Sequence, residues 1–201
     1  MKMSFRKEKK YRLSYSDMAS IEHQLLKKGM KQLYPMRKIN SCYFDNARMS
    51  MFHDSEEGVL PRKKIRIRWY DQVSKYTQET KISSIEGRFK ISKKIIDEIK
   101  IPKIHQKKLV DNIYGDLSPV IIISYERSYY MLDNLRLTFD RNISYKNPSK
   151  VTKSIFKDEE CVMEVKTSVE CEDDYIEKII SLPTSRFSKY SRGLLKFKKM
   201  I

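Results

Sequence analysis

The sequence predicts an α+β protein whose strands form an antiparallel sheet. Charged and apolar residues alternate in several strand-like runs, most clearly in KKIRIRWY at 63–70, and successive side chains of a strand point to opposite faces of a sheet. Other segments carry apolar residues at helical spacing. Strands interspersed with helices are typical of the α+β class.

The chain is long enough for one domain with a sizeable core. It has 201 residues, of which 40% are hydrophobic, and only five Gly and six Pro, so we expect a single domain over 1–201 without a long linker. No apolar run approaches the roughly 20 residues of a membrane span, and the charged N-terminus has no signal region. The three cysteines lack metal-type spacing, which fits a reducing compartment. We therefore expect a cytoplasmic protein.

The first elements are a strand and a helix. Alternation in RKEKKYRLS predicts a strand over 6–14. Apolar residues at helical spacing predict a helix over 16–29, with Asp17 or Ser16 near the N-cap and Gly29 as the stop.

The rest of the chain is rich in strands. Further strands are predicted over 40–44, 63–70, 76–83, 88–92, 119–131, 135–144 and 161–168. The region 93–114 is predicted to be mostly helical and broken at Pro102. A last helix is predicted over 173–181, ending before Pro183.

A formal charge of +16 implies an anionic partner such as a nucleic acid, a membrane surface or a polyphosphate. A merely solubilising charge would instead predict lysines scattered over the surface, particularly on helices. Many of the arginines lie inside strand-like runs at a fixed parity. The pattern therefore favours a dedicated anion-binding face.

Charged residues repeat on one face of several predicted strands. The repeats are Glu8 with Lys10, Glu79 with Lys81, Glu164 with Lys166, the triplet Lys64, Arg66 and Arg68, and the set Arg136, Thr138 and Asp140. One interpretation is an open sheet whose polar face is in water. The other is a closed barrel with a charged lumen and helices packed on its outer apolar face. The pattern alone leaves both open.

Segments spread along nearly the whole chain resemble, in family order, the catalytic domain of the VTC-type polyphosphate polymerases of the triphosphate tunnel metalloenzyme superfamily. They are RKEKKY, INSCYFD, KKIRIRWY, ETKIS, GRFKIS, ISYERSYY, LRLTFDRNI, VMEVK and RFSKYSRG. The resemblance implies a closed antiparallel barrel of about eight strands, with helices outside and a tunnel that holds a triphosphate and a metal ion.

The resemblance also implies the roles of individual residues. The catalytic cations would be Arg66, Arg68, Arg127, Arg136 and Lys189. The triphosphate-binding residues would be Lys10, Lys81, Arg88, Lys90, Tyr125, Lys166 and Ser188. Glu164 would bind the metal, while Glu8 and Glu79 would be either further metal ligands or partners of neighbouring cations.

The implied reaction is metal-dependent transfer of the γ-phosphate of ATP, or of another nucleoside triphosphate, to phosphate, pyrophosphate or a growing polyphosphate chain. The residue types suit it, because Arg binds phosphate in a bidentate manner and Lys acts as a mobile point charge. Mn²⁺ or Mg²⁺ prefers carboxylate and phosphate oxygens. Phosphoryl transfer depends mainly on positioning and charge neutralisation, and the chain lacks the glycine-rich phosphate-binding loop pattern.

Two alternatives remain open. The same tunnel serves triphosphatases, in which water replaces the phosphate acceptor. A non-catalytic binder of polyphosphate or nucleic acid would also suit the charge, but nucleic acid is less favoured because the Glu164 carboxylate opposes anion binding unless a metal bridges it. Eukaryotic relatives carry membrane-spanning domains, so a separate membrane protein is an expected partner, with the chain at the inner face of the membrane.

Overall fold

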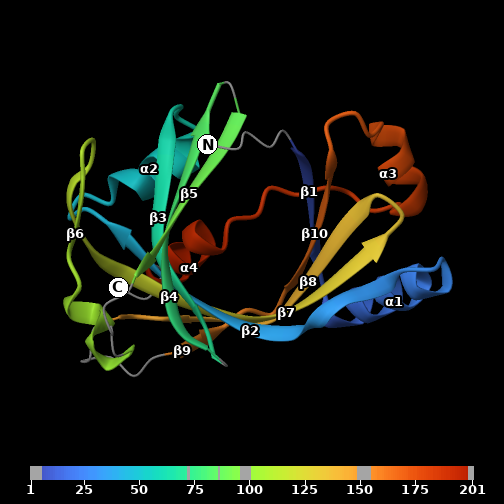
Figure 1. Ribbon diagram of the computed structural model, residues 1–201, viewed down its shortest axis with the longest axis horizontal. Helices are drawn as coiled ribbons and strands as arrows, with labels where there is room; N and C mark the ends of the chain where they lie inside the picture. The colour runs from blue at the N-terminus through green and yellow to red at the C-terminus, as the bar shows by residue number, and fades with distance from the viewer. Residues whose placement is uncertain (1–5, 72, 86, 96–100, 149–154, 199–201) are drawn as a thin grey trace. The chain divides into compact units, whose positions relative to one another are not determined.

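The computed structural model describes residues 6–71, 73–85, 87–95, 101–148 and 155–198 (Figure 1). The strands are β1 (Arg6–Leu13), β2 (Lys31–Asp45), β3 (Arg62–Tyr70), β4 (Val73–Ser84), β5 (Gly87–Ile95), β6 (Leu109–Asp111), β7 (Gly115–Leu132), β8 (Leu135–Lys146), β9 (Ile155–Lys157) and β10 (Cys161–Ser168). The helices are α1 (Tyr15–Lys27), α2 (Ser50–Glu57), the 3-10 helix η1 (Ile101–Gln106), α3 (Asp173–Ile179) and α4 (Lys189–Lys198). In this part of the chain no helix has the length and apolar character needed to cross a membrane.

The strands form a ten-stranded sheet in the order β1-β10-β8-β7-β2-β3-β4-β5, with β6 on β7 and β9 on β8. The ladders are antiparallel, which confirms the predicted α+β class. In the described residues β1 and β5 end the order and do not pair with each other, so hydrogen bonds do not close the sheet. The closed barrel is therefore not confirmed and stays a prediction.

The chain forms two compact units, each built from three segments. The first unit comprises Met1–Lys38, Tyr125–Ile143 and Asp158–Phe187, and the second comprises Ile39–Ser124, Ser144–Lys157 and Ser188–Ile201. Three strands, β2, β7 and β8, contribute residues to both units.

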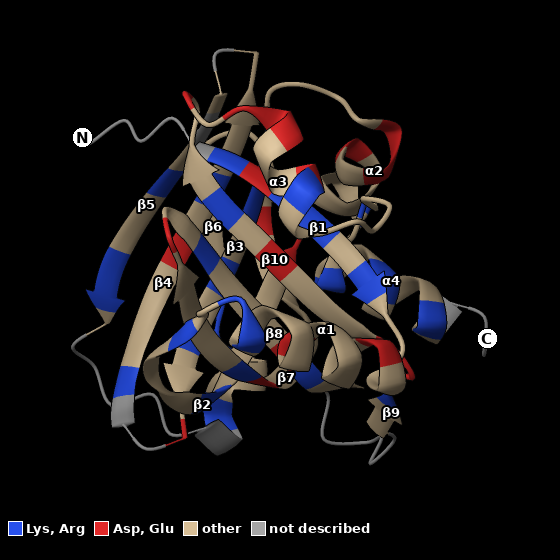
Figure 2. Cartoon of the chain, turned by 90° about the vertical axis from the view of Figure 1, so that its right-hand side faces the viewer, with Lys and Arg blue, Asp and Glu red and all other residues tan. Residues whose placement is uncertain are grey.

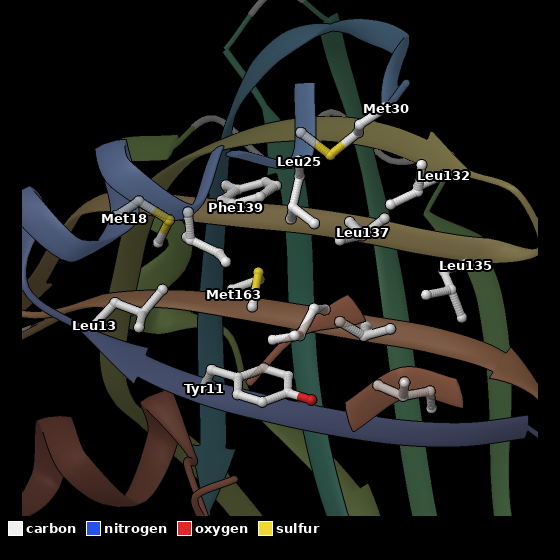
Figure 3. Packing of buried hydrophobic residues seen from close by; sticks show 14 of the residues in the cluster. Tyr11, Leu13, Met18, Leu25, Met30, Leu132, Leu135, Leu137, Phe139 and Met163 are labelled. Carbon is white, nitrogen blue, oxygen red and sulfur yellow. The ribbon is translucent and has the colours of Figure 1, made fainter. Parts of the chain in front are cut away.

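In the first unit, helices cover the apolar face of the sheet. The core cluster includes odd-numbered residues of β8 and β10, together with Met18 and Leu25 of α1. Figure 3 shows these two α1 side chains pointing toward Leu137, Phe139 and Met163. Ile176 of α3 joins the same cluster. The alternation in the sequence therefore places the opposite, even-numbered side chains of these strands on a polar face.

Both ends of α1 lie close to the predicted ones. Ser14 is the N-cap, and its hydroxyl accepts a hydrogen bond of 3.0 Å from the Asp17 amide. Ser16 and Asp17 follow in the first turn, near the N-cap as predicted, and the Asp17 carboxylate accepts a bond from the Ser14 hydroxyl. The stop at Gly29 is confirmed, since its φ of +95° is easily reached only by glycine.

In the second unit, α2 packs against the apolar face of β2 and β3. Ile65, Ile67 and Trp69 of β3 join Met51 of α2 in one buried cluster. The alternating cations of β3 therefore point to the other face of this sheet. Figure 1 shows β3, β4 and β5 side by side, as their paired registers require.

Several elements differ from the sequence-based expectations. The helices α2 and α4, and the first half of β2, were not predicted. The predicted helical region 93–114 is wrong at 93–95, which belong to β5, and at 109–111, which form β6; η1 supplies only a short 3-10 helix, and 96–100 lie outside the described residues. The long apolar and basic stretch suggested a helix, but pairing with neighbouring strands decides its conformation.

Gly193 of α4 provides a test of packing in the second unit. A Cβ at this position would lie 2.5 Å from Tyr145 Cδ1 and would also meet Ile121 Cδ1. We expect Gly193→Ala to lower the free energy of unfolding by about 1–3 kcal/mol, although alanine is the better helix former. Urea unfolding measures the change.

The control is Ile121→Val, which removes the Cδ1 atom that the new methyl would meet. The double variant Gly193→Ala, Ile121→Val should lose less stability than the sum of the two single losses. Additive losses would show that this contact does not limit the space at Gly193.

Candidate functional site

The polar face of the first unit carries a cluster of paired charges. We define the first cluster as Glu8 and Lys10 of β1, Arg127 of β7, Arg136 and Asp140 of β8, and Glu164 and Lys166 of β10. The strand registers place Glu8, Lys166 and Arg136 in one row and Lys10, Glu164 and Thr138 in the next. Figure 2 shows Lys and Arg beside Asp and Glu on β1 and β10. The alternation of residues in the sequence thus predicted which side chains lie on this face.

Glu164 is a buried, ionised carboxylate in this cluster. Only 8% of the residue is exposed. Lys166 Nζ lies 2.6 Å from Oε1, and Arg127 Nη2 lies 3.9 Å from Oε2. Burial alone would raise the pKa of Glu164, but the charges of Lys166, Arg127 and Lys10 outweigh it and hold the pKa far below its ordinary value. Glu164 therefore keeps its negative charge at neutral pH.

Glu8 is a second carboxylate beside Glu164. It lies 3.0 Å from Lys10 Nζ and 3.7 Å from Lys166 Nζ. Burial and repulsion from Glu164 raise the pKa of Glu8, whereas Lys10 and Lys166 lower it, and the net effect is a lowered pKa. The shared contact with Lys166 shows that the two carboxylates are held on the same patch of the sheet.

Arg127 is held by the carboxylate of Asp140. The sequence predicted that Asp140 lies on this face but gave it no role. Arg127 Nε lies 2.5 Å from Asp140 Oδ1 and Arg127 Nη2 lies 2.7 Å from Oδ2. Asp140 is fully buried. Burial lowers the pKa of Arg127, but Asp140 and other acidic neighbours raise it well above its ordinary value. This pair fixes a permanent positive charge next to Glu164 and to the Tyr125 ring, whose centroid is 5.3 Å from Arg127 Cζ.

The second unit carries a more strongly cationic group. We define the second cluster as Lys64, Arg66 and Arg68 of β3, Glu79 and Lys81 of β4, and Lys90 of β5. The registers align Lys64, Lys81 and Lys90 in one row across the three strands. Arg66 pairs with Glu79 in the adjacent row.

Glu79 is the centre of this second cluster. It is 4% exposed, and its Oε2 lies 2.5 Å from Arg66 Nη2 while its Oε1 lies 2.5 Å from Lys90 Nζ. Burial raises the pKa of Glu79, but Arg66, Arg68 and the bond to Lys90 lower it to about 2. Both carboxylate oxygens contact cations at 2.5 Å, and the second cluster contains no second carboxylate, which together favour the interpretation of Glu79 as their partner over a metal-ligand role.

The cationic side of KKIRIRWY is not a solvated surface. The side chains of Arg66 and Arg68 are 8% and 11% exposed. Arg66 Nη1 donates to Tyr43 Oη at 2.8 Å, and Arg68 Nε donates to Ser41 Oγ at 3.2 Å. Trp69 and the two isoleucines are buried on the opposite face. Both faces of this strand are therefore covered, and the open-sheet interpretation does not describe β3.

The start of α4 brings Ser188 to the second cluster. Lys64 Nζ donates to Ser188 Oγ at 3.0 Å. Lys189, half-buried, follows as the first residue of α4. Lys81 is exposed on β4, and the side chain of Arg88 lies outside the described residues.

The predicted site residues thus divide between the two clusters. The first unit holds Glu8, Lys10, Tyr125, Arg127, Arg136, Glu164 and Lys166, and the second holds Arg66, Arg68, Glu79, Lys81, Lys90, Ser188 and Lys189. A single lumen lined by both sets stays a prediction. Sequence reasoning did not assign roles to Tyr43, Asp45 or Tyr190, which support the second cluster and carry no local signal of that role.

The first cluster fits a hard divalent cation. Within the described ranges no group of three or more His, Cys, Asp or Glu side chains is arranged to hold a metal. Mg²⁺ usually needs only one or two protein carboxylates, with water and substrate phosphate as its other ligands. Glu8 and Glu164 provide such a pair. Thr138, which opposes Glu164, is 6% exposed, and its hydroxyl has no hydrogen-bond partner within the described part of the chain. A polar atom thus remains beside Glu164 for water of a hydrated ion.

Glu79 leads to a prediction about stability and pH. Its pKa in the folded chain, about 2, lies below the ordinary value of 4.5. The ionised group therefore stabilises the fold above pH 4.5, and this contribution is lost as the pH falls from 4.5 toward 2. We expect Glu79→Gln to reduce the difference in unfolding free energy between pH 6 and pH 3, measured by urea unfolding.

The control for Glu79→Gln is Glu160→Gln. Glu160 also pairs with an arginine, since its Oε1 lies 2.8 Å from Arg12 Nη2, but both side chains are partly exposed. Solvent screens this pair, so its loss should change the pH dependence less. Equal effects of the two substitutions would contradict the buried role of Glu79.

The comparisons with known proteins agree with this architecture. A family model of the VTC domain matches residues 5–198. No curated protein matches the sequence. Solved structures share the fold at low identity. A candidate adenylate cyclase from Bacillus halodurans has a TM-score of 0.59 and 12% identity, covering 92% of this chain and 94% of that one. One from Vibrio parahaemolyticus has a TM-score of 0.56 and 13% identity, covering 96% and 99%.

A third structure is a candidate adenylyl cyclase from Hippeastrum, in which a triphosphatase activity dominates. It has a TM-score of 0.55 and 15% identity, and the alignment covers 94% of this chain and 95% of that one. Identities this low establish the fold alone. The match to the family model covers nearly the whole chain, and with this match the protein belongs to the VTC-domain family.

Proposed function

We propose that this chain is a polyphosphate polymerase that transfers the γ-phosphate of ATP, or of another nucleoside triphosphate, to phosphate, pyrophosphate or a growing polyphosphate chain. The observation that carries the proposal is Glu164, a buried and ionised carboxylate surrounded by cations in a VTC-family chain. A buried carboxylate can simply orient the cations around it, as Glu79 does, but Glu164 also lies beside a second carboxylate, Glu8. A site that binds phosphate through a metal ion requires a negative charge.

The two clusters suit different parts of this task. In the second cluster five cations surround one carboxylate, whereas the first contains four cations and three carboxylates. A triphosphate carries about four negative charges, so the second cluster has the excess charge to hold it. The first cluster is nearly balanced, which suits a bound dication with its phosphate ligands.

Glu164 and Glu8 would hold Mn²⁺ or Mg²⁺. When bound, the ion would neutralise charge on the transferring phosphoryl group. Arg127, fixed by Asp140, keeps a positive charge at this place. Arg66 presents its guanidinium in one orientation, because Glu79 and Tyr43 hold it from two sides. Such fixed cations lower the repulsion between donor and acceptor phosphates without rearranging during the reaction.

The resemblance implies a closed barrel with one lumen for triphosphate and polyphosphate. It also implies a separate membrane protein as partner, since eukaryotic relatives carry membrane-spanning domains in the same chain.

A metal-dependent triphosphatase is the second candidate. It is favoured by the Hippeastrum structure, a fold neighbour in which triphosphatase activity dominates. The two activities share the cationic site and differ in the acceptor, which is water in one case and phosphate in the other.

Incubation with ATP and Mn²⁺, followed by a gel that separates polyphosphate by chain length, tests the proposal. A polymerase gives a ladder of polyphosphate together with nucleoside diphosphate. Release of orthophosphate without a ladder supports the triphosphatase, and the absence of any product indicates a binder of polyphosphate or nucleic acid.

Substitution of Glu164 separates metal-assisted chemistry from simple charge attraction. We expect Glu164→Gln to lose on the order of several kcal/mol of transition-state stabilisation, while inorganic triphosphate still binds. Arg66→Ala should instead weaken the binding of triphosphate itself. Turnover of ATP and triphosphate affinity by calorimetry are measured on both variants.

The matched control is Glu126→Gln. Glu126 is a strand carboxylate of the same unit, but its Oε2 accepts a hydrogen bond from Asn142 Nδ2 at 2.7 Å rather than joining the cations. This control should turn over ATP at the wild-type rate. Wild-type turnover by Glu164→Gln would falsify the metal assignment.

A further inference from the structure

A buried tyrosine–carboxylate pair attaches the start of α4 to the end of β2 within the second unit. Tyr190 Oη donates a hydrogen bond of 2.6 Å to Asp45 Oδ2. The two residues are 2% and 0% exposed. Burial and the neighbouring Asp45 charge raise the pKa of Tyr190 far above its ordinary value, so the hydroxyl stays a donor throughout the physiological pH range.

Asp45 is itself held rigidly by backbone amides. Its Oδ1 accepts from Asn46 N at 2.8 Å and from Met51 N at 3.1 Å. Its Oδ2 accepts from Phe52 N at 3.0 Å as well as from Tyr190. These bonds tie the carboxylate to the first turn of α2, where it supplies the cap that Met49 lacks. Asp45 is therefore a fixed attachment point for α4.

The Tyr190 ring continues this connection to the second cluster. It stacks on the Tyr43 ring with a centroid separation of 4.9 Å and an interplanar angle of 22°. Tyr43 Oη accepts the 2.8 Å bond from Arg66. Lys64 Nζ lies 5.8 Å from the centroid of the Tyr190 ring and also binds Ser188. The start of α4 thus contacts Lys64 directly and Arg66 through the Tyr43 ring.

From this geometry we propose that Asp45 and Tyr190 are positioning residues for the second cluster. They hold Ser188 against Lys64, and they keep Tyr43 in place to orient the Arg66 guanidinium. Neither residue needs to touch substrate. The inference rests on the proposed function, because it treats the second cluster as the triphosphate-binding group.

Tyr190→Phe tests the inference because it removes the hydroxyl and keeps the stacked ring. Tyr114→Phe is the matched control, since Tyr114 Oη donates a bond of the same 2.6 Å length to Asp54 in the same unit, and neither residue belongs to the second cluster. The two deciding measurements on the full chain are the affinity for inorganic triphosphate and the amide hydrogen exchange of the peptide 184–198. The Michaelis constant and turnover number for ATP and the melting temperature are measured alongside them.

We expect Tyr190→Phe to weaken triphosphate binding about fivefold to tenfold and to speed exchange in that peptide. The Michaelis constant for ATP should rise more than the turnover number falls. Tyr114→Phe should lower the melting temperature about as much as Tyr190→Phe does, yet leave triphosphate affinity and exchange of the α4 peptide unchanged. If Tyr190→Phe matches this control in both measurements, Tyr190 is only a structural residue and the inference is wrong.

Two further results distinguish a failure of the inference from a failure of the proposed function. A wild-type chain that binds triphosphate but makes no polyphosphate would overturn the polymerase proposal, while the affinity and exchange measurements would still decide the role of Tyr190. If Tyr190→Phe does not fold, Tyr43→Phe removes the next hydroxyl of the same connection, the one that accepts from Arg66. Unchanged triphosphate affinity in that variant would overturn the inference.

Discussion

Placing several lysines and arginines on one face of a sheet is costly, because like charges repel and each side chain loses contact with water. In this chain each cationic cluster contains a buried carboxylate that offsets the cost. Glu164 lies among Lys166, Arg127 and Lys10, and Glu79 lies among Arg66, Arg68 and Lys90. Both carboxylates keep lowered pKa values because the surrounding cations outweigh the effect of burial. The cations are consequently held in fixed positions before any anion arrives.

The same electrostatics distinguishes the two carboxylates. Glu79 uses both of its oxygens for Arg66 and Lys90, so it orients the cations of the second cluster. Glu164 also contacts cations with both oxygens, Lys166 closely and Arg127 at a longer distance, but it lies beside a second carboxylate, Glu8. It also lies opposite Thr138, whose hydroxyl has no hydrogen-bond partner among the described residues. Such an oxygen-rich patch suits a hydrated dication. The neighbouring carboxylate thus distinguishes Glu164 from Glu79.

Strand parity allowed most of both clusters to be predicted from the sequence. Charged residues two positions apart in a strand must share a face, and this predicts that Lys64, Arg66 and Arg68 lie together, as they do on β3. The residues that hold the clusters in place could not be predicted in this way. Asp45 and Tyr190 are far apart in sequence, and neither shows a local pattern that relates it to the other. The helix α2 was not predicted because its cap comes from Asp45, which lies before the helix. Residues 93–95 were predicted to be helical, but pairing with β4 places them in β5.

We propose that the Glu164 carboxylate binds the metal while the cations bind the phosphates. Ultrafiltration of the protein with inorganic triphosphate and Mn²⁺, followed by measurement of both species retained with the protein, tests this division most directly. We expect the wild-type protein to retain both, and the Glu164→Gln variant to retain triphosphate with much less Mn²⁺. Undiminished retention of Mn²⁺ by the variant would show that Glu164 does not bind the metal.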